Sequence, residues 1–174
     1  CKKSWLIVRP TNIWGPHHPN FKDGLWKYIY KGLYIHPGFT ISQKNYCFVD
    51  NASYQYLIAL NSLIEKKINS GAIIYLVDEF KDNSIWLNDI SINLRGKKII
   101  KVPLFTWQIL ASFGDFLNLL KIKFPMNSAR LSRIRKNEKN LSRFTISEEK
   151  SLISYDQAIK KTTNWLKLYY SSLS

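Results

Sequence analysis

Short apolar runs alternate with amphipathic helical segments along the chain, and this alternation constrains the fold more than any other sequence feature. The strand-like runs cover residues 6–8, 34–39, 46–49, 72–77 and 99–102. Helices are predicted over residues 21–33, after Asp50, over 84–96, after Thr106 and after Ser154. Alternating strands and helices are typical of α/β domains. With 174 residues and 45% hydrophobic content, the chain is long enough for one domain with a buried core.

Polar residues and glycines mark where the predicted helices begin and end. Asp50, Ser84 and Thr106 are predicted N-cap residues, because their side-chain oxygens can accept from the first free backbone N–H groups. Gly96 is predicted to end the helix after Ser84, and residues 154–157 form a capping box before the last helix. The predicted core-facing residues of these helices are Ala52, Tyr56, Ala59, Leu60 and Leu63; Trp86, Leu87, Ile90 and Leu94; and Tyr155, Ala158, Ile159, Thr162, Trp165, Leu166 and Tyr169.

The segment 102–120 is apolar enough to be compared with a membrane span. It contains Pro103, Gln108, Asp115 and Asn118, and a charged residue near the centre of a span is costly. A buried core helix is therefore predicted here, and no transmembrane segment is assigned. Its predicted apolar face consists of Trp107, Leu110, Phe113, Leu117 and Leu120.

The chain is strongly basic, with a formal net charge of +14 from 26 Lys and Arg against 12 Asp and Glu. Its lysines are scattered, which is typical of a solvated surface. A positive field still attracts nucleotide phosphates, nucleic acid or acidic lipid. The densest basic run, residues 130–139, has no interleaved aromatic residues on which bases could stack, so nucleic acid is not favoured as a partner.

The cysteines and histidines give no metal or disulfide signature. Two cysteines do not make a disulfide framework, and Cys47 lies among apolar neighbours, so it is predicted to be a reduced core residue of a cytoplasmic protein. The spacing of His17, His18, His36 and Cys47 matches no zinc pattern. We predict no metal site and interpret the histidines as loop residues beside a substrate pocket.

The segment 5–16, WLIVRPTNIWGP, reads as a strand that leaves a core and enters a polar turn suited to binding. Its Arg9–Pro16 part resembles the pattern Arg-Pro-x-Asn-x-x-Gly-Pro, which follows the sixth strand of extended short-chain dehydrogenases, the NAD(P)-dependent nucleotide-sugar epimerases and dehydratases. Lys44–Asn51 is similar to that family's Arg-Asp-Phe-x-x-Val-Asp-Asp. Residues 72–78, 84–96 and 154–166 resemble, in the same order, a later strand, a helix and the terminal helix.

The resemblance implies the C-terminal part of a Rossmann-like fold: the last sheet strands plus a mostly helical substrate-binding region, with residues 1–174 as one unit. None of the seven glycines has the spacing of the family's dinucleotide-binding turn, and no Tyr-x-x-x-Lys catalytic pair occurs. No catalytic residue is therefore assigned. On this interpretation the N-terminal dinucleotide-binding half lies outside the chain, which is inactive on its own, while the complete enzyme uses NAD or NADP.

The resemblance also implies site residues. Pro10 and Thr11 match the stretch beside the nicotinamide. Asn12 matches an asparagine that contacts the nucleotide sugar, although a turn asparagine bonded to its own backbone is equally consistent with the sequence. Lys44 stands where the family has an arginine for the nucleotide diphosphate. Lysine keeps the charge but lacks the two-point fork, and a solvated lysine is the alternative.

Arg130 or Arg133 is the candidate for the family's later phosphate-binding arginine, with a solvated basic face as the alternative for each. The predicted partner is a nucleotide sugar, and the resemblance allows a homodimer of the complete enzyme. Two other classes of function stay open at this point. One is a non-catalytic binding or scaffold module of the same fold; the other is a basic protein that binds nucleic acid or a membrane surface.

Overall fold

The computed structural model describes residues 4–19, 24–38, 41–122, 124, 126–141 and 151–172. Strands and helices alternate through most of the chain, as the sequence predicts. Their bounds, in chain order, are β1 Ile7–Pro10, β2 Asn12–Trp14, α1 Leu25–Lys31, β3 Ile35–Pro37, β4 Gln43–Phe48, α2 Val49–Ile64, β5 Ile73–Leu76, β6 Glu79–Asp82, α3 Asn83–Arg95, β7 Ile100–Val102, α4 Leu104–Leu119, α5 Ser128–Arg135 and α6 Tyr155–Ser171.

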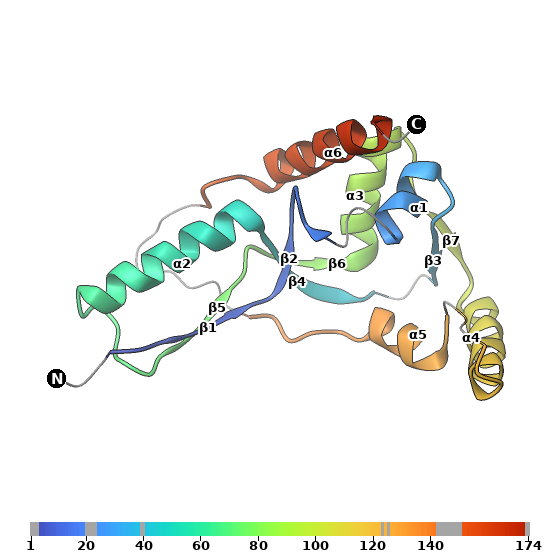
Figure 1. The fold of residues 1–174 in the computed structure, drawn as a ribbon, viewed down its shortest axis with the longest axis horizontal. Helices are drawn as coiled ribbons and strands as arrows, with labels where there is room; N and C mark the ends of the chain where they lie inside the picture. The colour runs from blue at the N-terminus through green and yellow to red at the C-terminus, as the bar shows by residue number, and fades with distance from the viewer. Residues whose placement is uncertain are drawn as a thin grey trace.

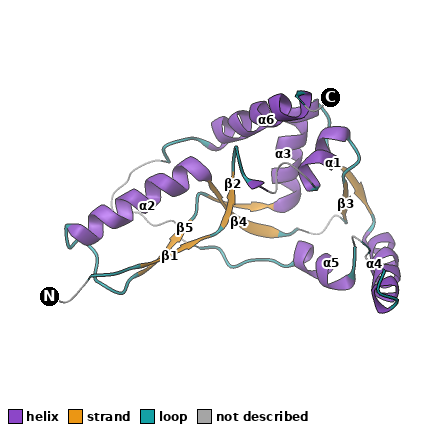
Figure 2. Ribbon diagram, in the orientation of Figure 1, coloured by secondary structure: helices purple, strands orange, loops and turns teal. Residues whose placement is uncertain are grey.

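The strands form small sheets in which parallel pairing dominates. β1 pairs with β5, β2 with β4 and β3 with β7, all in parallel, and β6 joins the other edge of β4 in the antiparallel sense. The molecule is elongated, with β1, β5 and α2 toward the N-terminal end and α4 at the opposite end (Figure 1). Helices α2 and α6 lie on one side of the strands and α5 on the other (Figure 2). This is the α/β class that the alternation predicts.

Aromatic rings gathered around Trp86 form the centre of the core. Tyr46 of β4 stacks on Trp86 with ring centroids 4.4 Å apart, and Trp14 and Trp26 meet it edge-on at 5.6 and 5.2 Å. Such aromatic pairs contribute about 0.5–1.5 kcal/mol each beyond their buried area. The predicted face of α3, which includes Trp86, is buried throughout, and the predicted face of α6 is buried or half-buried. Both predictions are confirmed, and α3 and α6 pack together over this core.

The predicted helix ends are partly right. The capping box at Ser154 is present, and Gly96 ends α3 in the left-handed conformation, as predicted. Ser84 is not an N-cap, because β6 continues to Asp82 and the Asp82 carboxylate accepts from the backbone N–H of Ser84 and of Ile85. Burial alone would raise the pKa of Asp82, but hydrogen bonds from Ser84 and Ser42 outweigh it and lower that pKa.

The other two predicted caps are wrong for a similar reason, since in each case the helix begins earlier. β4 runs directly into α2, so Phe48 is the N-cap and Asp50 lies within the first turn, where its carboxylate accepts from the Lys161 ammonium at 2.5 Å. α4 begins at Leu104 directly after Pro103, and Thr106 donates its hydroxyl to the Pro103 carbonyl at 2.7 Å.

Helix α4 corrects the prediction of a buried core helix. Its buried residues are Ala111 and Gly114, whereas Leu110, Phe113 and Leu120 of the predicted apolar face are exposed. The side of α4 that packs against the rest of the chain carries small residues, because larger side chains would not fit there. Among the residues that the structure describes, no helix combines the length and apolar character needed to cross a bilayer.

The remaining differences concern short elements. Strands β2 and β6 and helix α5 were not predicted, because three to eight residues are too few for a clear period. Helix α1 begins only at Leu25, and residues 21–23 of the predicted 21–33 helix lie outside the described residues. Cys47 is buried in the core, as predicted, and its sulfur is a thiol that is not part of a disulfide. Cys1 lies outside the described part of the chain.

Candidate functional site

Asn12 lies at the start of β2, directly after β1 and Thr11. Strands β2 and β4 run parallel, with Asn12 opposite Tyr46. The Asn12 amide Nδ2 donates to the backbone carbonyl of Asn45 at 2.8 Å and lies 3.3 and 3.4 Å from the carboxylate oxygens of Glu138. These bonds reach across to β4 and to a distant segment, so they differ from the local turn that the sequence allowed.

The Glu138 carboxylate gathers polar groups from two other parts of the chain, Asn12 in β2 and Lys44 and Asn45 in β4. It accepts from the Asn45 backbone N–H at 2.9 Å and from Asn45 Nδ2 at 3.2 Å, and Lys44 Nζ lies 3.6 Å away. We call Asn12, Lys44, Asn45 and Glu138 the Glu138 cluster. Partial burial alone would raise the pKa of Glu138, but hydrogen bonds from Asn45 and Asn12 and the charge of Lys44 lower it. No local pattern marked Glu138 as a site residue, since it lies in a basic run far from the recognised motifs.

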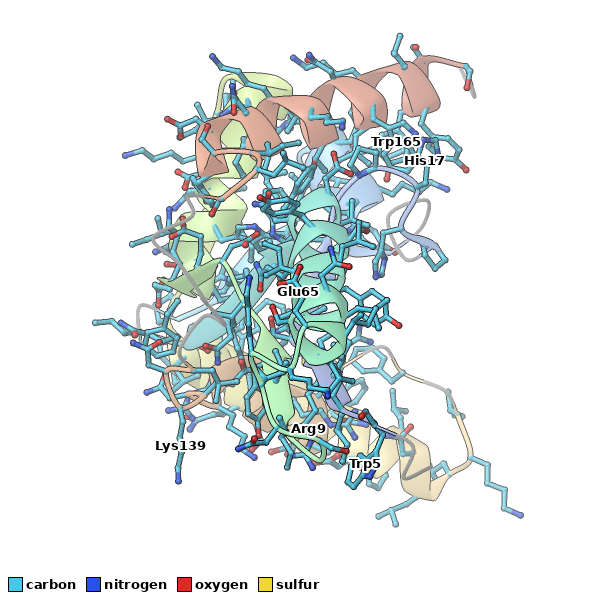
Figure 3. All side chains as sticks on the ribbon, turned by 90° about the vertical axis from the view of Figure 1, so that its left-hand side faces the viewer. Trp5, Arg9, His17, Glu65, Lys139 and Trp165 are labelled. Atoms are coloured by element: carbon cyan, nitrogen blue, oxygen red, sulfur yellow. The ribbon has the colours of Figure 1, made fainter. Side chains whose placement is uncertain are left out.

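Backbone and amide hydrogen bonds hold residues 137–141 alongside β4. Gln43 donates its N–H to Asn137 Oδ1 at 2.8 Å and accepts from the Glu138 N–H at 2.9 Å. The Asn45 side chain then donates to the Lys139 carbonyl at 2.8 Å and accepts from the Leu141 N–H at 3.0 Å. Lys139 itself extends outward at the surface (Figure 3). Glu138 is therefore held in the cluster by its own backbone as well as by its carboxylate.

Lys44 is mostly covered, with 16% of its side chain exposed, so it is not a solvated lysine. Its ammonium lies 3.4 Å from the Arg133 carbonyl and donates to it, in addition to its pairing with Glu138. Arg133 thus reaches the cluster through its backbone, and its side chain is exposed. Arg130 lies one turn earlier on α5, where its backbone N–H donates to the N-cap residue Asn127. The structure brings Asn12, Lys44 and the Arg133 carbonyl together, and places Arg130 elsewhere on α5.

Pro10 is the last residue of β1, and Thr11 follows it directly. The Thr11 hydroxyl donates to the Leu76 carbonyl at 2.8 Å, which joins the ends of β1 and β5. Pro10 lines an open apolar groove of about 560 Å³ between the strands and α2, together with Val8, Ile13, Ala52, Tyr56 and Leu76. None of the seven glycines has the spacing of a pyrophosphate-binding turn.

A second polar network ties the end of β5 to the start of α2. The Asp78 carboxylate accepts from the Phe48 N–H at 2.8 Å, from Asn51 Nδ2 at 2.9 Å and from Gln55 Nε2 at 2.7 Å. Asn51 also exchanges two hydrogen bonds with the backbone of Ile153 ahead of α6. Buried Asn51 and Gln55 take the inner face of α2, where the sequence predicted Tyr56 and Leu60, which are exposed.

The histidines do not line the Glu138 cluster. His36 lies in β3 with 2% of its surface exposed, and its Nδ1 is 3.0 Å from the Tyr34 hydroxyl, so its interpretation as a loop residue is wrong. Burial, together with the charge of Lys101, lowers the pKa of His36 to about 4. His17 lies beside Trp165, with ring centroids 5.2 Å apart (Figure 3). Within the described residues, no three His, Cys, Asp or Glu side chains lie close enough to hold a metal ion.

Solved structures of epimerases share this fold. The chain matches UDP-glucose 4-epimerase from Thermotoga maritima with a TM-score of 0.55 and 14% identity, over 98% of this chain and 47% of that one. UDP-glucuronic acid 4-epimerase from Bacillus cereus, solved with UDP-glucuronic acid and NAD, gives 0.53 and 14%, over 95% and 46%. Human epimerase family protein SDR39U1, solved with NADPH, gives 0.54 and 13%, over 91% and 48%.

These likenesses confirm the predicted fold, which is the α/β fold found in about half of an extended short-chain dehydrogenase of the epimerase type. The chain spans slightly less than half the length of the structures it matches. No protein-family model matches the sequence, and no curated protein is similar enough to count as a relative.

Proposed function

We propose that this chain is the substrate-binding portion of an NAD(P)-dependent nucleotide-sugar epimerase or dehydratase. In this role it holds the nucleotide diphosphate and shapes the sugar pocket, and a dinucleotide-binding half supplies the cofactor and the catalytic pair. Hydride transfer between the sugar and the nicotinamide is the chemistry of the complete enzyme. The chain alone is then inactive.

The observation that carries the proposal is the meeting of Asn12 and Lys44. They come from two motifs more than thirty residues apart, each selected for a role in nucleotide-sugar binding. In the fold both groups lie at the Glu138 carboxylate, at 3.3 and 3.6 Å. An amide and an ammonium that converge on one anionic group have the chemistry that a diphosphate oxygen requires.

The pairing of β1 supports the need for a second half. Within the described residues, β1 pairs only with β5, and Ile7 and Ile73 are exposed on this two-stranded ribbon. Parallel strands are normally covered on both faces, and an isolated pair of strands is marginal in water. A further strand on the free edge of β1 and a covering layer are what such a ribbon needs.

Calorimetric titration of the chain with UDP tests the proposal. We expect UDP to bind, and Lys44→Ala to weaken binding about ten- to hundredfold, because a charge-assisted hydrogen bond contributes about 1.5–3 kcal/mol. Lys98→Ala, at an exposed lysine outside the cluster, is the matched control and should bind as the wild type does. Lys44→Arg should keep its affinity, since the charge is preserved. An equal affinity for Lys44→Ala and Lys98→Ala, or no binding of UDP at all, contradicts the proposal.

Turnover gives a second test. The purified chain should show no NAD(P)H-linked epimerase, dehydratase or dehydrogenase activity. In the complete enzyme, Lys44→Ala should raise KM and change kcat much less, which is the pattern for binding energy lost equally from ground state and transition state. Turnover by the purified chain, free of contaminating enzyme, would refute its role as one half.

A further inference from the structure

Helix α4 presents a row of large apolar side chains to solvent. Phe105, Ile109, Phe113, Phe116 and Leu119 are 61%, 67%, 53%, 56% and 81% exposed; we call these five residues the α4 stripe. Phe105, Ile109, Phe116 and Leu119 follow one another at intervals that place them on one face of a helix, and Phe113 flanks that face. A contiguous apolar surface of this kind marks an interaction site.

The opposite side of α4 fixes this orientation. A Cβ atom at Gly114 would lie 1.8 Å from the Met126 carbonyl oxygen, so only glycine lets the chain approach so closely there. Asp115 is the only charged residue in α4, and its carboxylate accepts from the Ser128 N–H at the start of α5, at 3.3 Å. The helix therefore turns its small residues and its one charge toward α5. The α4 stripe faces away from the chain except at Phe113, whose ring meets Phe124 edge-on at 5.9 Å.

Positive charge is concentrated on the helix that packs against α4. Helix α5 packs against α4 and carries Arg130, Arg133 and Arg135 with no acidic residue, and Lys136 follows directly. These four cationic side chains are exposed, as is Lys121 at the end of α4. Helix α4 lies at the end of the molecule opposite the N-terminus, and α5 lies beside it (Figure 1).

We propose that α4 lies flat on an anionic phospholipid bilayer, with the α4 stripe at the boundary between headgroups and acyl chains and the α5 cations among the lipid phosphates. Exposed aromatic and aliphatic residues beside lysine and arginine are the composition of interfacial helices. At 1.5 Å per residue, the 16 residues of α4 extend about 24 Å along the surface. This assignment is independent of the proposed enzymatic role.

The charge distribution favours a bilayer over a second copy of the chain. A twofold interface brings the same patch of both copies together. Pairing through the α4 stripe would bring together two chains that each carry a formal net charge of +14, and like charges repel. An anionic bilayer covers the same apolar residues and attracts the positive charge.

Vesicle flotation tests the proposal, because bound protein rises with the vesicles whereas aggregated protein sediments. The full chain should float with vesicles of equal parts phosphatidylcholine and phosphatidylglycerol at low ionic strength. The double variant Ile109→Ser/Phe116→Ser should lower partitioning at least about tenfold, since two apolar side chains no longer leave water. Ile64→Ser/Leu168→Ser removes two equally exposed apolar side chains from α2 and α6 and should float as the wild type does.

The cations are tested separately. Arg135→Gln/Lys136→Gln should lower partitioning to the anionic vesicles about 30-fold, whereas Lys97→Gln/Lys98→Gln, with the same loss of charge, should leave it unchanged. Phe116→Ser alone gives an independent measurement if the double stripe variant loses its circular dichroism. Failure of the wild type to float, or equal flotation of the stripe variant and its control, overturns the proposal. Self-association that the stripe variants abolish, without flotation, makes α4 a protein interface instead.

Discussion

Glu138→Gln is the substitution that best probes the Glu138 cluster. The carboxylate accepts from Asn45 twice, faces the Asn12 amide and pairs with Lys44. Glutamine keeps the shape but loses the charge, and one of its two terminal groups becomes a donor that faces other donors. Hydrogen bonds to a charged group contribute about 1.5–3 kcal/mol. Because the Glu138 side chain is 33% exposed, water replaces part of this, and we expect a loss of about 1–2 kcal/mol.

The loss should depend on pH with a defined sign. The pKa of Glu138 is lower in the folded chain than its ordinary value of 4.5, so the folded state favours the charged carboxylate. Its contribution to the free energy of unfolding is therefore complete above that ordinary value and disappears as the pH falls through the lower folded value. The difference between wild type and Glu138→Gln should be full at neutral pH and should close in strong acid.

Urea denaturation followed by tryptophan fluorescence at several pH values measures this difference. A loss of 1–2 kcal/mol corresponds to a fall of about 2–8 °C in Tm for a chain of this size. Glu65→Gln is the matched control, because Glu65 pairs with exposed Lys67 at the surface and such pairs contribute little. If the two variants unfold alike, or if the difference is the same at every pH, the charge of Glu138 does not stabilise the cluster.

The affinity of the chain for UDP should rise up to about fivefold in Glu138→Gln, although the variant is less stable, since the substitution releases Lys44.

Three further predictions concern the parts of the fold that surround the site. The pKa of His36 is about 4 in the folded chain, against a reference value of 6.5, so the neutral imidazole contributes its full stabilisation above pH 6.5. The free energy of unfolding of the wild type should therefore fall by up to about 3 kcal/mol as the pH drops toward 4. His36→Gln should show a flatter dependence on pH in the same denaturation series. Asp78→Asn should cost about 1–3 kcal/mol, because Phe48, Asn51 and Gln55 lose an acceptor, whereas exposed Asp156→Asn should be neutral. Gly15→Ala should lower the denaturation midpoint more than Gly24→Ala. Both glycines have positive φ, at which an alanine costs about 1–2 kcal/mol. A Cβ atom at Gly15 would also lie 2.6 Å from Val49, whereas a Cβ atom at Gly24 would meet nothing within 4 Å.

The sequence determined the features that short-range physics controls. Apolar residues at helical spacing identified the buried faces of α3 and α6, and Ser154 and Gln157 identified a capping box that spans four residues. The β-branched run at 72–77 identified β5. Asn12 and Lys44 could be selected because each belongs to a recognisable local pattern.

The tertiary structure decided which distant groups meet. Glu138 reaches Asn45 across 93 positions and Asn12 across 126, and no local pattern in a basic run marks a glutamate for that role. The observed N-caps of α2, α3 and α4 precede the predicted ones, because a strand or a proline directly before each helix starts the helix earlier than the predicted polar residue. Likewise, the spacing of apolar residues showed that α4 has an apolar face, but it did not show whether protein or solvent covers that face. The orientation of α4 depends on the close approach of Gly114 and Met126, which turns the side of the helix with small residues toward the rest of the chain. Periodicity describes a single helix, whereas burial depends on the elements that pack against it.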